Sequence, residues 1–544
     1  MLMKKLILFF FLILISLGVR AQKIAESVYW VYFSDKAGNG YQVKQPEQFL
    51  SDRSVNRRAL QKLAVDPLDL PVNPAYLQEI RDMGVIIKHV SRWLNGIAMI
   101  QMDDELFNEV LQKSFTDTIP WKPEKLTLHF PPASGQSRFS PPLEQAPSFD
   151  YGIAREQVEM LRTDQLHAMG YTAGGVWIGV LDAGFFNVDS LPSFFPLLDE
   201  ERILGTRNYV NGTSIYRQSN SHGMSVLSLM AGEWDGNMVG TAPHASYLLC
   251  MTEDPVQETR IEEIAWIEAA EYADSLGVDV LNTSLGYSEF DGGIYDYSYR
   301  DMDGASTFIS RAASLTASRG MILCNSAGNS GDDEWFYVTA PADATDILAV
   351  GAVDSTNLLA SFSSRGPSFD ARIKPDVTAM GKATGVQHRS GGLARGNGTS
   401  YASPLLAGSV ATLWQAFPEL SANELISYIR QSGHLSGRPD PNYGFGTPNM
   451  LYAYHSITGI PARMKSETME IWPNPATDRI MIRIPETTSG LQQVRLYDMS
   501  GKLTLLQELE LPGALILPAS MKSGIYIAEI RAPAFVYRSR LIKQ

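Results

Sequence analysis

In Gly398-Thr399-Ser400-Tyr401-Ala402-Ser403-Pro404, a polar, glycine-rich run meets an apolar helical pattern. A serine at such a corner is exposed, and the free N–H groups at the start of the helix point towards it. That geometry suits a nucleophile, because its attack on a carbonyl creates an oxyanion beside unpaired backbone donors. A lone Gly-Thr-Ser is more often an ordinary helix N-cap. The interpretation of Ser400 therefore depends on what the rest of the chain supplies.

Residues 148–456, which contain this corner, alternate short apolar runs with helical patterns. The runs are almost wholly apolar, as expected of parallel strands that are buried on both faces. Strands that alternate with helices in this way predict a doubly wound α/β domain. The expected strands are 175–181, 247–250, 278–281, 321–324 and 347–353, and the expected helices are 224–231, 261–276 and 307–319.

Polar residues follow several of these runs at the point where each strand should end. Asp182 follows the first strand, Asn329 comes shortly after the fourth, and His222 opens a helix. In doubly wound sheets, function collects at the carboxyl edge of the strands. Turn or helix caps alone do not readily explain this many polar residues at strand ends, all preceding Ser400 in the sequence. Asp182, His222, Asn329 and Ser400 are therefore the candidate catalytic set.

With these residues in this order, the chain resembles the subtilisin-like serine proteases over residues 150–455. The intervals between the four candidates are 40, 107 and 71 residues, which suit that family. The resemblance implies that Ser400 is the nucleophile and His222 the general base, with Asp182 orienting the imidazole. It also implies that Asn329 donates its side-chain amide to the oxyanion, beside the Ser400 N–H. The implied partners are protein or peptide substrates.

The resemblance further implies a substrate cleft. Ser284-Leu285-Gly286 matches the family segment that pairs with the substrate backbone as an extra strand and forms one wall of the S1 pocket. Ala327 and Gly328 would form the opposite wall. The floor is expected from residues 338–340, where Thr339 would leave a medium-sized, uncharged pocket.

Three positions depart from the family pattern. Ala183 stands where the family usually has Ser or Thr, Met224-Ser225 stands where it usually has Thr-His, and Tyr401 replaces the usual Met. None of these changes removes a proton-transfer group, so we expect an active secreted endopeptidase. One alternative is a catalytically inactive surface-binding protein on the same fold, against which the complete catalytic set argues. Another is a peptide ligase, which would need a slow deacylation step that sequence does not reveal.

The N-terminus has the pattern of a secretory signal peptide. Lys4-Lys5 precedes an apolar run over residues 6–19, and Val19-Arg20-Ala21 offers small residues for cleavage after Ala21. The run is too short for a stable membrane span, and no other stretch is long enough, so we expect no transmembrane anchor. The chain has 544 residues, 44% of them apolar and 19% charged, as expected of soluble globular domains. Its net charge of −14 argues against a nucleic-acid partner.

Residues 22–147 are expected to form a small α+β pro-domain followed by a linker. The expected strands are 28–33, 85–90 and 96–100, and the expected helices are 46–63 and a segment after Pro74. Residues 130–147 are rich in Pro, Ser and Gln, as in a linker. The resemblance implies an inhibitory pro-domain whose segment 130–147 lies in the active cleft and is cut by the enzyme near Ser148. The alternative is a permanent N-terminal domain.

Residues 465–544 differ from the rest of the chain in composition. Short alternating strands with turns predict a small β-sandwich. Trp472-Pro-Asn-Pro-Ala476, Leu496-Tyr-Asp-Met-Ser-Gly501, Ser523-Gly-Ile-Tyr526 and the basic C-terminus together resemble the sorting domain of the type IX secretion system of Bacteroidetes. The implied partner is the type IX secretion machinery, and the implied location is outside the cell or on its outer surface. A carbohydrate-binding sandwich is the alternative, but no row of exposed aromatic residues favours it.

The chemistry implied by the resemblance requires no cofactor, and no metal ligand is assigned. Calcium is a common structural ion in the family, and Asp301-Met302-Asp303-Gly304 offers carboxylates. Without the rest of a ligand loop this is weak support, and a turn before the helix at 307 is the preferred interpretation. A calcium site therefore stays unassigned.

The two cysteines, Cys250 and Cys324, are expected to stay reduced. The family's sheet order places two strands between theirs, which separates them by about 14 Å. A disulfide requires Cα atoms within about 7 Å.

Overall fold

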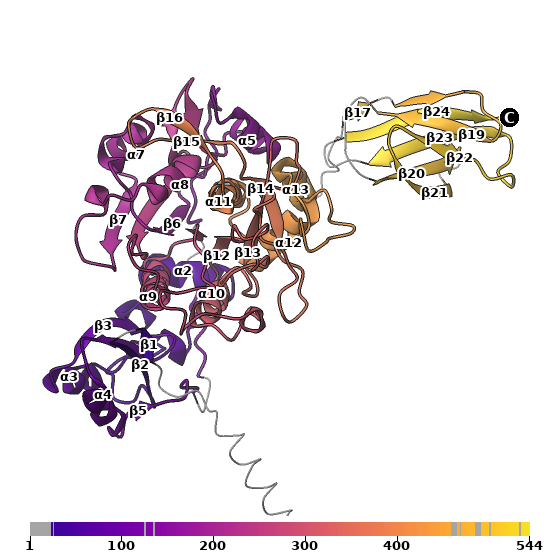
Figure 1. Cartoon of the computed structure of the whole chain (residues 1–544). Coiled ribbons are helices and arrows are strands. Elements are labelled where there is room, and N and C mark those ends of the chain that lie inside the picture. Colours follow the sequence, from indigo (N-terminus) through magenta and orange to yellow (C-terminus); the bar gives the residue numbers. More distant parts are fainter. Residues whose placement is uncertain are drawn as a thin grey trace, which may run out of the picture.

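The computed structural model describes residues 23–25, 27–123, 127–133, 137–458, 465–467, 469–484, 491–499, 502–531 and 535–544. They form an N-terminal α+β region, a central α/β region and a C-terminal region of strands (Figure 1). The expected signal peptide, residues 1–21, lies outside the described residues. Among the described residues, no helix combines the length and the apolar character that a membrane span needs.

The central region is built on a seven-stranded sheet in the order β14-β13-β12-β11-β6-β10-β7, and all its strand pairs are parallel. This confirms the predicted doubly wound α/β class. The strands are β6 (Trp177–Asp182), β7 (Ile203–Asn208), β10 (Ser246–Met251), β11 (Val280–Thr283), β12 (Ile322–Ser326), β13 (Leu348–Val353) and β14 (Val377–Met380).

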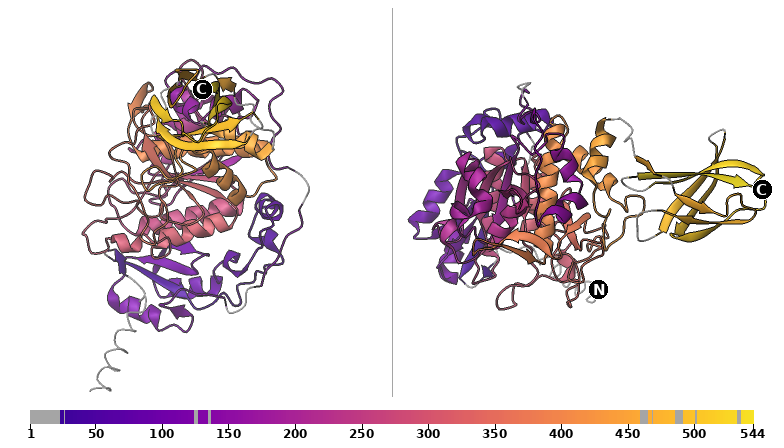
Figure 2. Two further views of the ribbon diagram at one scale, coloured as in Figure 1. Left: turned by 90° about the vertical axis from the view of Figure 1, so that its right-hand side faces the viewer. Right: turned by 90° about the horizontal axis from the view of Figure 1, so that it is seen from above.

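Helices cover both faces of this sheet (Figures 1 and 2). Along β6, Val180 packs into the core shared with α8 and α11, while Leu181 packs into the core shared with α9 and α10. Successive residues of a strand point to opposite faces, so an apolar strand can serve both cores. The helices are α5 (Arg155–Met160), α6 (Thr163–His167), α7 (Phe195–Asp199), α8 (His222–Ala231), α9 (Ile261–Leu276), α10 (Phe308–Ser318), α11 (Thr399–Ala416), α12 (Ala422–Ser432) and α13 (Met450–Thr458).

The cysteine prediction is confirmed. Cys250 lies on β10 and Cys324 on β12, and β6 and β11 separate these two strands in the sheet. The two side chains also belong to the cores on opposite faces, and both thiols are free and buried. Burial raises the pKa of Cys250 to about 12, which keeps it in the unreactive thiol form.

The N-terminal region has an antiparallel sheet in the order β1-β2-β4-β3, with β5 paired to β2. Its elements are β1 (Lys23–Ala25), β2 (Val28–Phe33), α2 (Asp52–Leu60), α3 (Pro74–Asp82), β3 (Ile86–Ser91), β4 (Gly96–Ile100), α4 (Asp104–Leu111) and β5 (Thr116–Asp117). The single helix predicted over 46–63 is wrong. A 3-10 turn at Pro46–Gln48 is followed by α2, which begins where the Ser51 side chain accepts a hydrogen bond from the Ser54 N–H.

The expected position of the linker in the active cleft is wrong for residues 138–143. Residues 138–143 contain no helix or strand, as predicted, but they lie at the amino-terminal edge of the central sheet. The Ser140 N–H donates to the Gly174 carbonyl (3.0 Å), and the Leu143 N–H donates to the Gly170 carbonyl (2.9 Å). Both acceptors precede β6, whereas the candidate catalytic residues follow the carboxyl ends of the strands. Contacts with residues far away in the sequence determine where the linker lies, and local composition does not reveal such contacts.

Two further segments complete the fold. Residues 384–396 form the hairpin of β15 (Thr384–Gln387) and β16 (Leu393–Gly396), and β16 lies within the glycine-rich run that precedes Gly398. The C-terminal region packs two sheets around one apolar core, which confirms the predicted β-sandwich. Its strands are β17 (Lys465–Glu467), β18 (Glu470–Trp472), β19 (Arg479–Arg483), β20 (Leu491–Asp498), β21 (Leu503–Glu510), β22 (Gly513–Ile516), β23 (Gly524–Arg531) and β24 (Phe535–Lys543).

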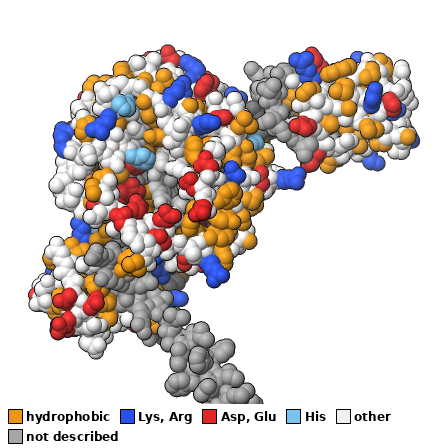
Figure 3. All heavy atoms as spheres, viewed as in Figure 1, with side chains coloured by type: hydrophobic (Ala, Val, Ile, Leu, Met, Phe, Trp, Pro, Cys, Tyr) orange, Lys and Arg blue, Asp and Glu red, His pale blue; other side chains and the backbone are white. Residues whose placement is uncertain are grey.

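On the face of the molecule drawn in Figure 3, acidic side chains gather in the middle of the central region, while Lys and Arg side chains are scattered. That distribution agrees with the net charge of −14. This face offers no continuous basic stripe of the kind that binds a phosphate backbone.

Candidate active site

Ser400 lies in the first turn of α11, next to the end of β11. It is 8% exposed, and its hydroxyl donates a hydrogen bond to the Ser284 carbonyl (3.1 Å). The Ser284 hydroxyl donates in return to the Ser400 carbonyl (2.9 Å). These reciprocal bonds fix the start of α11 against the segment after β11. The N–H of Ser400 belongs to the first helical turn, where backbone donors have no intrahelical acceptor.

Asp182 and His222 form a hydrogen-bonded pair at the carboxyl edge of the sheet. Asp182 is the last residue of β6, His222 is the first residue of α8, and their Oδ1 and Nδ1 atoms are 2.7 Å apart. Asp182 is 1% exposed, while the His222 side chain is 31% exposed. The ring of Tyr401, which follows Ser400, has its centroid 6.1 Å from the His222 ring. The structure therefore brings three of the predicted residues to one corner of the molecule.

The charge of Asp182 controls the protonation of His222. Burial by itself favours the neutral imidazole, but the charge and the hydrogen bond of Asp182, with a smaller contribution from Glu253, raise the pKa of His222 to about 9. Asp182 Oδ1 also accepts the Ala183 N–H (2.8 Å), whereas Oδ2 is buried without a hydrogen-bond partner among the described residues. Asp182 therefore directs its hydrogen bonding through Oδ1, the oxygen that faces the imidazole.

Sequence reasoning missed one residue that acts on this pair electrostatically. Glu253 comes two residues after β10, and burial, then the charge of Asp182, raises its pKa to about 8. It is partly exposed. The rule that identified Asp182, a polar residue just past an apolar strand, applies equally to Glu253 and would have found it.

Asn329 lies near the start of the loop between β12 and β13, against the start of α11. Its Oδ1 accepts hydrogen bonds from the Thr399 N–H (2.8 Å) and from the Thr399 hydroxyl (2.9 Å). Because the main-chain N–H can only donate, the amide oxygen must face Thr399. The Nδ2 group is left without an acceptor among the described residues, and the Asn329 side chain is exposed. An oriented, unused amide donor of this kind suits an oxyanion that forms at Ser400.

Gly286 and Gly328, one from each predicted wall of a substrate pocket, both lie close to Thr339. A Cβ atom on Gly286 would come within 2.1 Å of Thr339 Oγ1, and a Cβ atom on Gly328 would come within 3.1 Å of the same oxygen. Glycine at both positions therefore allows a close approach. Thr339 is 5% exposed, and its hydroxyl has no hydrogen-bond partner among the described residues. Residue 339, from the segment predicted as the floor, therefore lies near both predicted wall segments.

Residues 173–446 match the model of the subtilase family, peptidase family S8. The chain belongs to the subtilase family. Subtilases of this kind are serine protease hydrolases, and the fold and the enzyme class predicted from the sequence are confirmed. Residues 28–138 match the S8 propeptide domain of Bacteroidota, and residues 470–544 match a C-terminal sorting domain of a secretion system.

Individual subtilases align with about half of this chain. Subtilisin DY of Bacillus licheniformis is 28% identical over 283 residues, which cover 52% of this chain and 89% of that protein. Subtilisin E of Bacillus subtilis (strain 168) is 30% identical over 314 residues, covering 57% of this chain and 72% of that protein. The solved structure of the prenylagaramide maturation protease PagA matches with a TM-score of 0.43 and 22% identity, over 55% of this chain and 99% of that chain.

The residues that depart from the subtilase pattern pack or form hydrogen bonds near His222. Met224 is fully buried in the core beneath α8, and the Ser225 hydroxyl donates to the Gln387 carbonyl of β15 (3.1 Å). Tyr401 lies beside the His222 ring, where burial and the charge of Asp182 raise the pKa of its phenol. These replacements use neutral side chains, so none adds a charge next to His222.

The acidic run considered for calcium forms a turn. Asp303 Oδ1 accepts the N–H groups of Ala305 (2.8 Å) and Ser306 (2.7 Å), and α10 begins at Phe308. Asp301 Oδ2 accepts the N–H of Ser298 (2.8 Å). Across the described parts of the chain, no group of three or more His, Cys, Asp or Glu side chains could hold a metal ion. The turn interpretation fits these contacts, and no residue is assigned to calcium.

Proposed function

We propose that this subtilase is a secreted endopeptidase that hydrolyses peptide bonds through an acyl-enzyme on Ser400. The observation that carries the proposal is the 2.7 Å pair of Asp182 and His222 beside the start of α11, which holds Ser400. The proposed domain boundaries are 1–21 for the signal peptide, 22–147 for the propeptide domain and linker, 148–456 for the peptidase and 465–544 for the sorting domain. The comparisons give no support to an inactive binding protein.

Acylation would begin when a substrate carbonyl enters beside Ser400. The Ser400 hydroxyl would leave the Ser284 carbonyl, which it now contacts at 3.1 Å, and pass its proton to His222 Nε2 as its oxygen bonds to the carbonyl carbon. The oxyanion would accept hydrogen bonds from the Asn329 amide and the Ser400 N–H. Collapse would expel the amine, which takes the proton from His222. Asp182 would stabilise the imidazolium throughout.

Deacylation would reverse these roles with water. A water molecule would attack the acyl carbon while His222 Nε2 takes its proton, and the second oxyanion would use the same donors. When the carbon–oxygen bond to Ser400 breaks, His222 returns the proton to the serine oxygen. The products are a carboxylic acid and the free enzyme, so no cofactor enters the atom balance.

Incubation with a defined peptide library tests this function, with cleavage sites identified by mass spectrometry. We expect internal cuts, with new termini on both products of each peptide. Removal of single terminal residues alone would contradict the endopeptidase proposal. Ligation products without hydrolysis would point to a transpeptidase.

Replacing Asn329 tests the oxyanion site. Asn329→Ala should lower kcat by about 10²- to 10³-fold with little change in KM, because the lost hydrogen bond forms only in the transition state. Steady-state kinetics on one peptide measures both constants. Asn329→Asp is the matched control, because it keeps the acceptor for Thr399 but lacks the amide donor, and it should lose kcat similarly. Full activity in Asn329→Asp would rule out the proposed donor role.

The position of Thr339 predicts a preference for small residues at the P1 position. Ser284-Leu285-Gly286 and Ala327-Gly328 are the proposed walls, and the close approach of Gly286 and Gly328 to Thr339 Oγ1 supports a pocket narrowed by this side chain. Thr339→Gly should raise kcat/KM for a Leu or Phe at P1 by about 10- to 100-fold relative to Ala, since a few carbon atoms in a pocket change selectivity by this much. Paired peptides that differ only at P1 measure the ratio. Thr345→Gly, at an exposed position, should leave it unchanged.

We further propose that residues 465–544 direct the protein to the type IX secretion machinery and so to the cell surface or the medium. The match to a sorting domain and the separate apolar core of this region support the proposal. Deleting 465–544 should retain the protein inside the cell envelope while peptide cleavage by the purified remainder persists. Fractionation and an activity assay on both forms measure this. Loss of cleavage in a folded deletion variant would make the tail part of the catalytic fold.

A further inference from the structure

Two chain segments flank the end of β6 at the carboxyl edge of the central sheet. In the strand order β11-β6-β10, the chain continues after β11 as Ser284-Leu285-Gly286 and after β10 as Thr252-Glu253. The chain after β6 turns away instead, and the Phe185 N–H donates to the Ile215 carbonyl (3.1 Å). The Thr252 N–H donates to the Asp182 carbonyl (3.0 Å), which places Glu253 next to the end of β6.

These two segments define where the residues before the scissile bond would lie. Under the proposed function, a substrate pairs with Ser284-Leu285-Gly286 as an extra strand, so it extends over the end of β6 towards the segment after β10. The P1 side chain enters the proposed pocket. Since successive side chains of a strand point to opposite sides, the side chain of the preceding residue, P2, points away from that pocket, towards His222 and Glu253. The charge of Glu253 contributes to the raised pKa of His222, as expected of a carboxylate close to the imidazole.

Three carboxylates on the β10 side form a group that we call the acidic flank. Glu253 and Glu258 lie in the segment after β10, and Glu262 lies in the first turn of α9. No Lys or Arg side chain forms an ion pair with any of the three among the described residues. Burial, then the charge of Asp182, raises the pKa of Glu253 to about 8, and burial, then the charge of Glu258, raises the pKa of Glu262 to about 9. An added cation would therefore stabilise the ionised form of these carboxyl groups.

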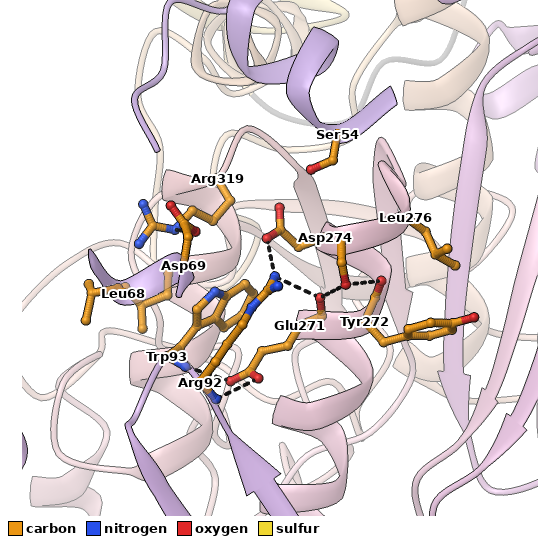
Figure 4. A network of polar contacts seen from close by, with 12 residues as sticks. Ser54, Leu68, Asp69, Arg92, Trp93, Glu271, Tyr272, Asp274, Leu276 and Arg319 are labelled. Atoms are coloured by element: carbon orange, nitrogen blue, oxygen red, sulfur yellow. Dashed lines mark hydrogen bonds and ion pairs between the residues drawn. The ribbon is translucent and has the colours of Figure 1, made fainter. Parts of the chain in front are cut away.

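The carboxylates near the other end of α9 differ from the acidic flank in this respect. Glu271 accepts hydrogen bonds from the main-chain N–H groups of Arg92 (2.9 Å) and Trp93 (3.0 Å), and Asp274 forms an ion pair with Arg92 (2.6 Å). Figure 4 shows Arg92 and Trp93 beside Glu271 and Asp274. Buried charges in proteins are normally paired in this way. The lack of such a cation at the acidic flank points to a cationic partner from outside the chain.

Hydrogen bonds hold the acidic flank in place. The Glu262 carboxylate accepts the Thr259 N–H (3.2 Å), which ties the segment after β10 to the start of α9. The Asp291 N–H donates to the Glu258 carbonyl (2.9 Å), and Asp291 Oδ2 accepts the Glu258 N–H (3.2 Å). Glu262 therefore supports this loop. The carboxylates of Glu253 and Glu258 make no hydrogen bond among the residues that the structure describes, so they are available to a substrate.

A buried hydroxyl group lies near the acidic flank without a partner. Tyr287 directly follows the segment proposed to pair with substrate, is 1% exposed, and stacks on Phe290 with 5.9 Å between ring centroids. Its hydroxyl has no hydrogen-bond partner in the described part of the chain. Burial, then the charges of Glu262, Glu253 and Glu258, raise the pKa of this phenol, as expected of an oxygen that faces the flank. A hydrogen-bond donor that enters here therefore meets an unused neutral acceptor beside the carboxylates.

From these contacts we propose that Glu253 selects substrates with Arg or Lys at P2. The guanidinium or ammonium group of that residue pairs with the Glu253 carboxylate, and Glu258 adds negative charge to the same surface. The substrate class is therefore peptides with a basic residue immediately before P1. Glu253 determines specificity and takes no part in bond making. This inference rests on the proposed function, because P2 is defined by cleavage at Ser400.

Matched peptides that differ only at P2 test this selection. Peptides with Arg or Gln at P2 and Ala at P1 are incubated with the purified wild-type enzyme, and kcat/KM is measured for each. We expect Arg to be preferred over Gln on the order of 10-fold, the size of effect of one partly exposed charge pair. Equal values for the two peptides would overturn the inference and leave the protease function standing. No cleavage of any peptide would refute the proposed function, and the inference with it.

Substitutions of Glu253 test whether this residue sets the preference. Glu253→Gln should bring the ratio of kcat/KM for Arg and Gln at P2 close to one, and Glu253→Lys should favour Glu over Arg at P2. A ratio measured within one variant cancels any change in kcat that reaches both peptides through His222. Glu419→Gln makes the same change at an exposed position before α12 and should keep the wild-type ratio. A wild-type ratio in Glu253→Gln, or a preference for Arg in Glu253→Lys, would overturn the assignment to Glu253.

Discussion

Replacing Ser400 with alanine should lower kcat on a peptide substrate by about 10⁶-fold, the size of effect that loss of a serine nucleophile causes in this mechanism. The change removes the hydroxyl that bonds to the Ser284 carbonyl and leaves the backbone N–H donors in place. Residual turnover should then come from the remaining oxyanion donors and from substrate binding. Single-turnover and steady-state assays on the same peptide measure the loss.

The control for this variant is Ser390→Ala, an exposed serine in the turn between β15 and β16, which should retain wild-type kinetics. A loss of less than about 100-fold in folded Ser400→Ala would contradict a covalent mechanism on this residue.

The same variant tests self-processing. In a host without other proteases, we expect Ser400→Ala to keep its N-terminal domain in one chain, while wild-type chains are cut near Ser148 by other copies of the enzyme, because residues 138–143 lie away from the catalytic residues of their own chain. Equal trimming of both proteins would rule out self-processing.

The second large loss of activity is expected when Asp182 is replaced. Asp182→Asn should lower kcat by about 10⁴-fold, because an amide N–H facing His222 Nδ1 would place the imidazole proton on Nε2, the atom that must accept the serine proton. The substitution also removes the charge that raises the pKa of His222 to about 9. Since His222 acts as a base when neutral, wild-type activity should rise with pH up to about that value.

The pH profile separates this effect from a general loss of structure. Without the Asp182 charge the pKa of His222 falls, so the acidic limb of the residual activity should move to lower pH. Measuring kcat/KM between pH 5 and 10 for both proteins tests the direction of this shift. Asp189→Asn, which removes an exposed pair with Arg217, should change neither the rate nor the profile. An unshifted acidic limb in Asp182→Asn would mean that another group sets the profile.

Most of the site could be predicted because its parts follow from local patterns. Asp182 and His222 come directly after an apolar strand and at the start of a helix, and a parallel sheet brings such positions to one edge. The Asp182–His222 pair follows from that rule and agrees with the structure. The same rule identifies Glu253, which lies two residues after the end of β10.

What the sequence did not predict depends on contacts between distant residues. The path of the linker is set by Arg138, which pairs with Asp279 more than a hundred positions later, and no local composition reveals that pair. The break between Pro46–Gln48 and α2 depends on Ser51, whose hydroxyl donates to the end of α9. Likewise, the glycine-rich run before Gly398 gains strand structure only because β16 pairs with β15.

The central claim, that Ser400 is a nucleophile activated by His222, is tested most directly by mapping a fluorophosphonate adduct. Wild-type protein, His222→Ala and Ser400→Ala are treated with the probe, digested and sequenced by mass spectrometry. We expect one adduct on Ser400 in the wild type, a large fall in its rate of formation in His222→Ala, and none in Ser400→Ala. An adduct on another residue, or labelling of Ser400 at the same rate without His222, would contradict it.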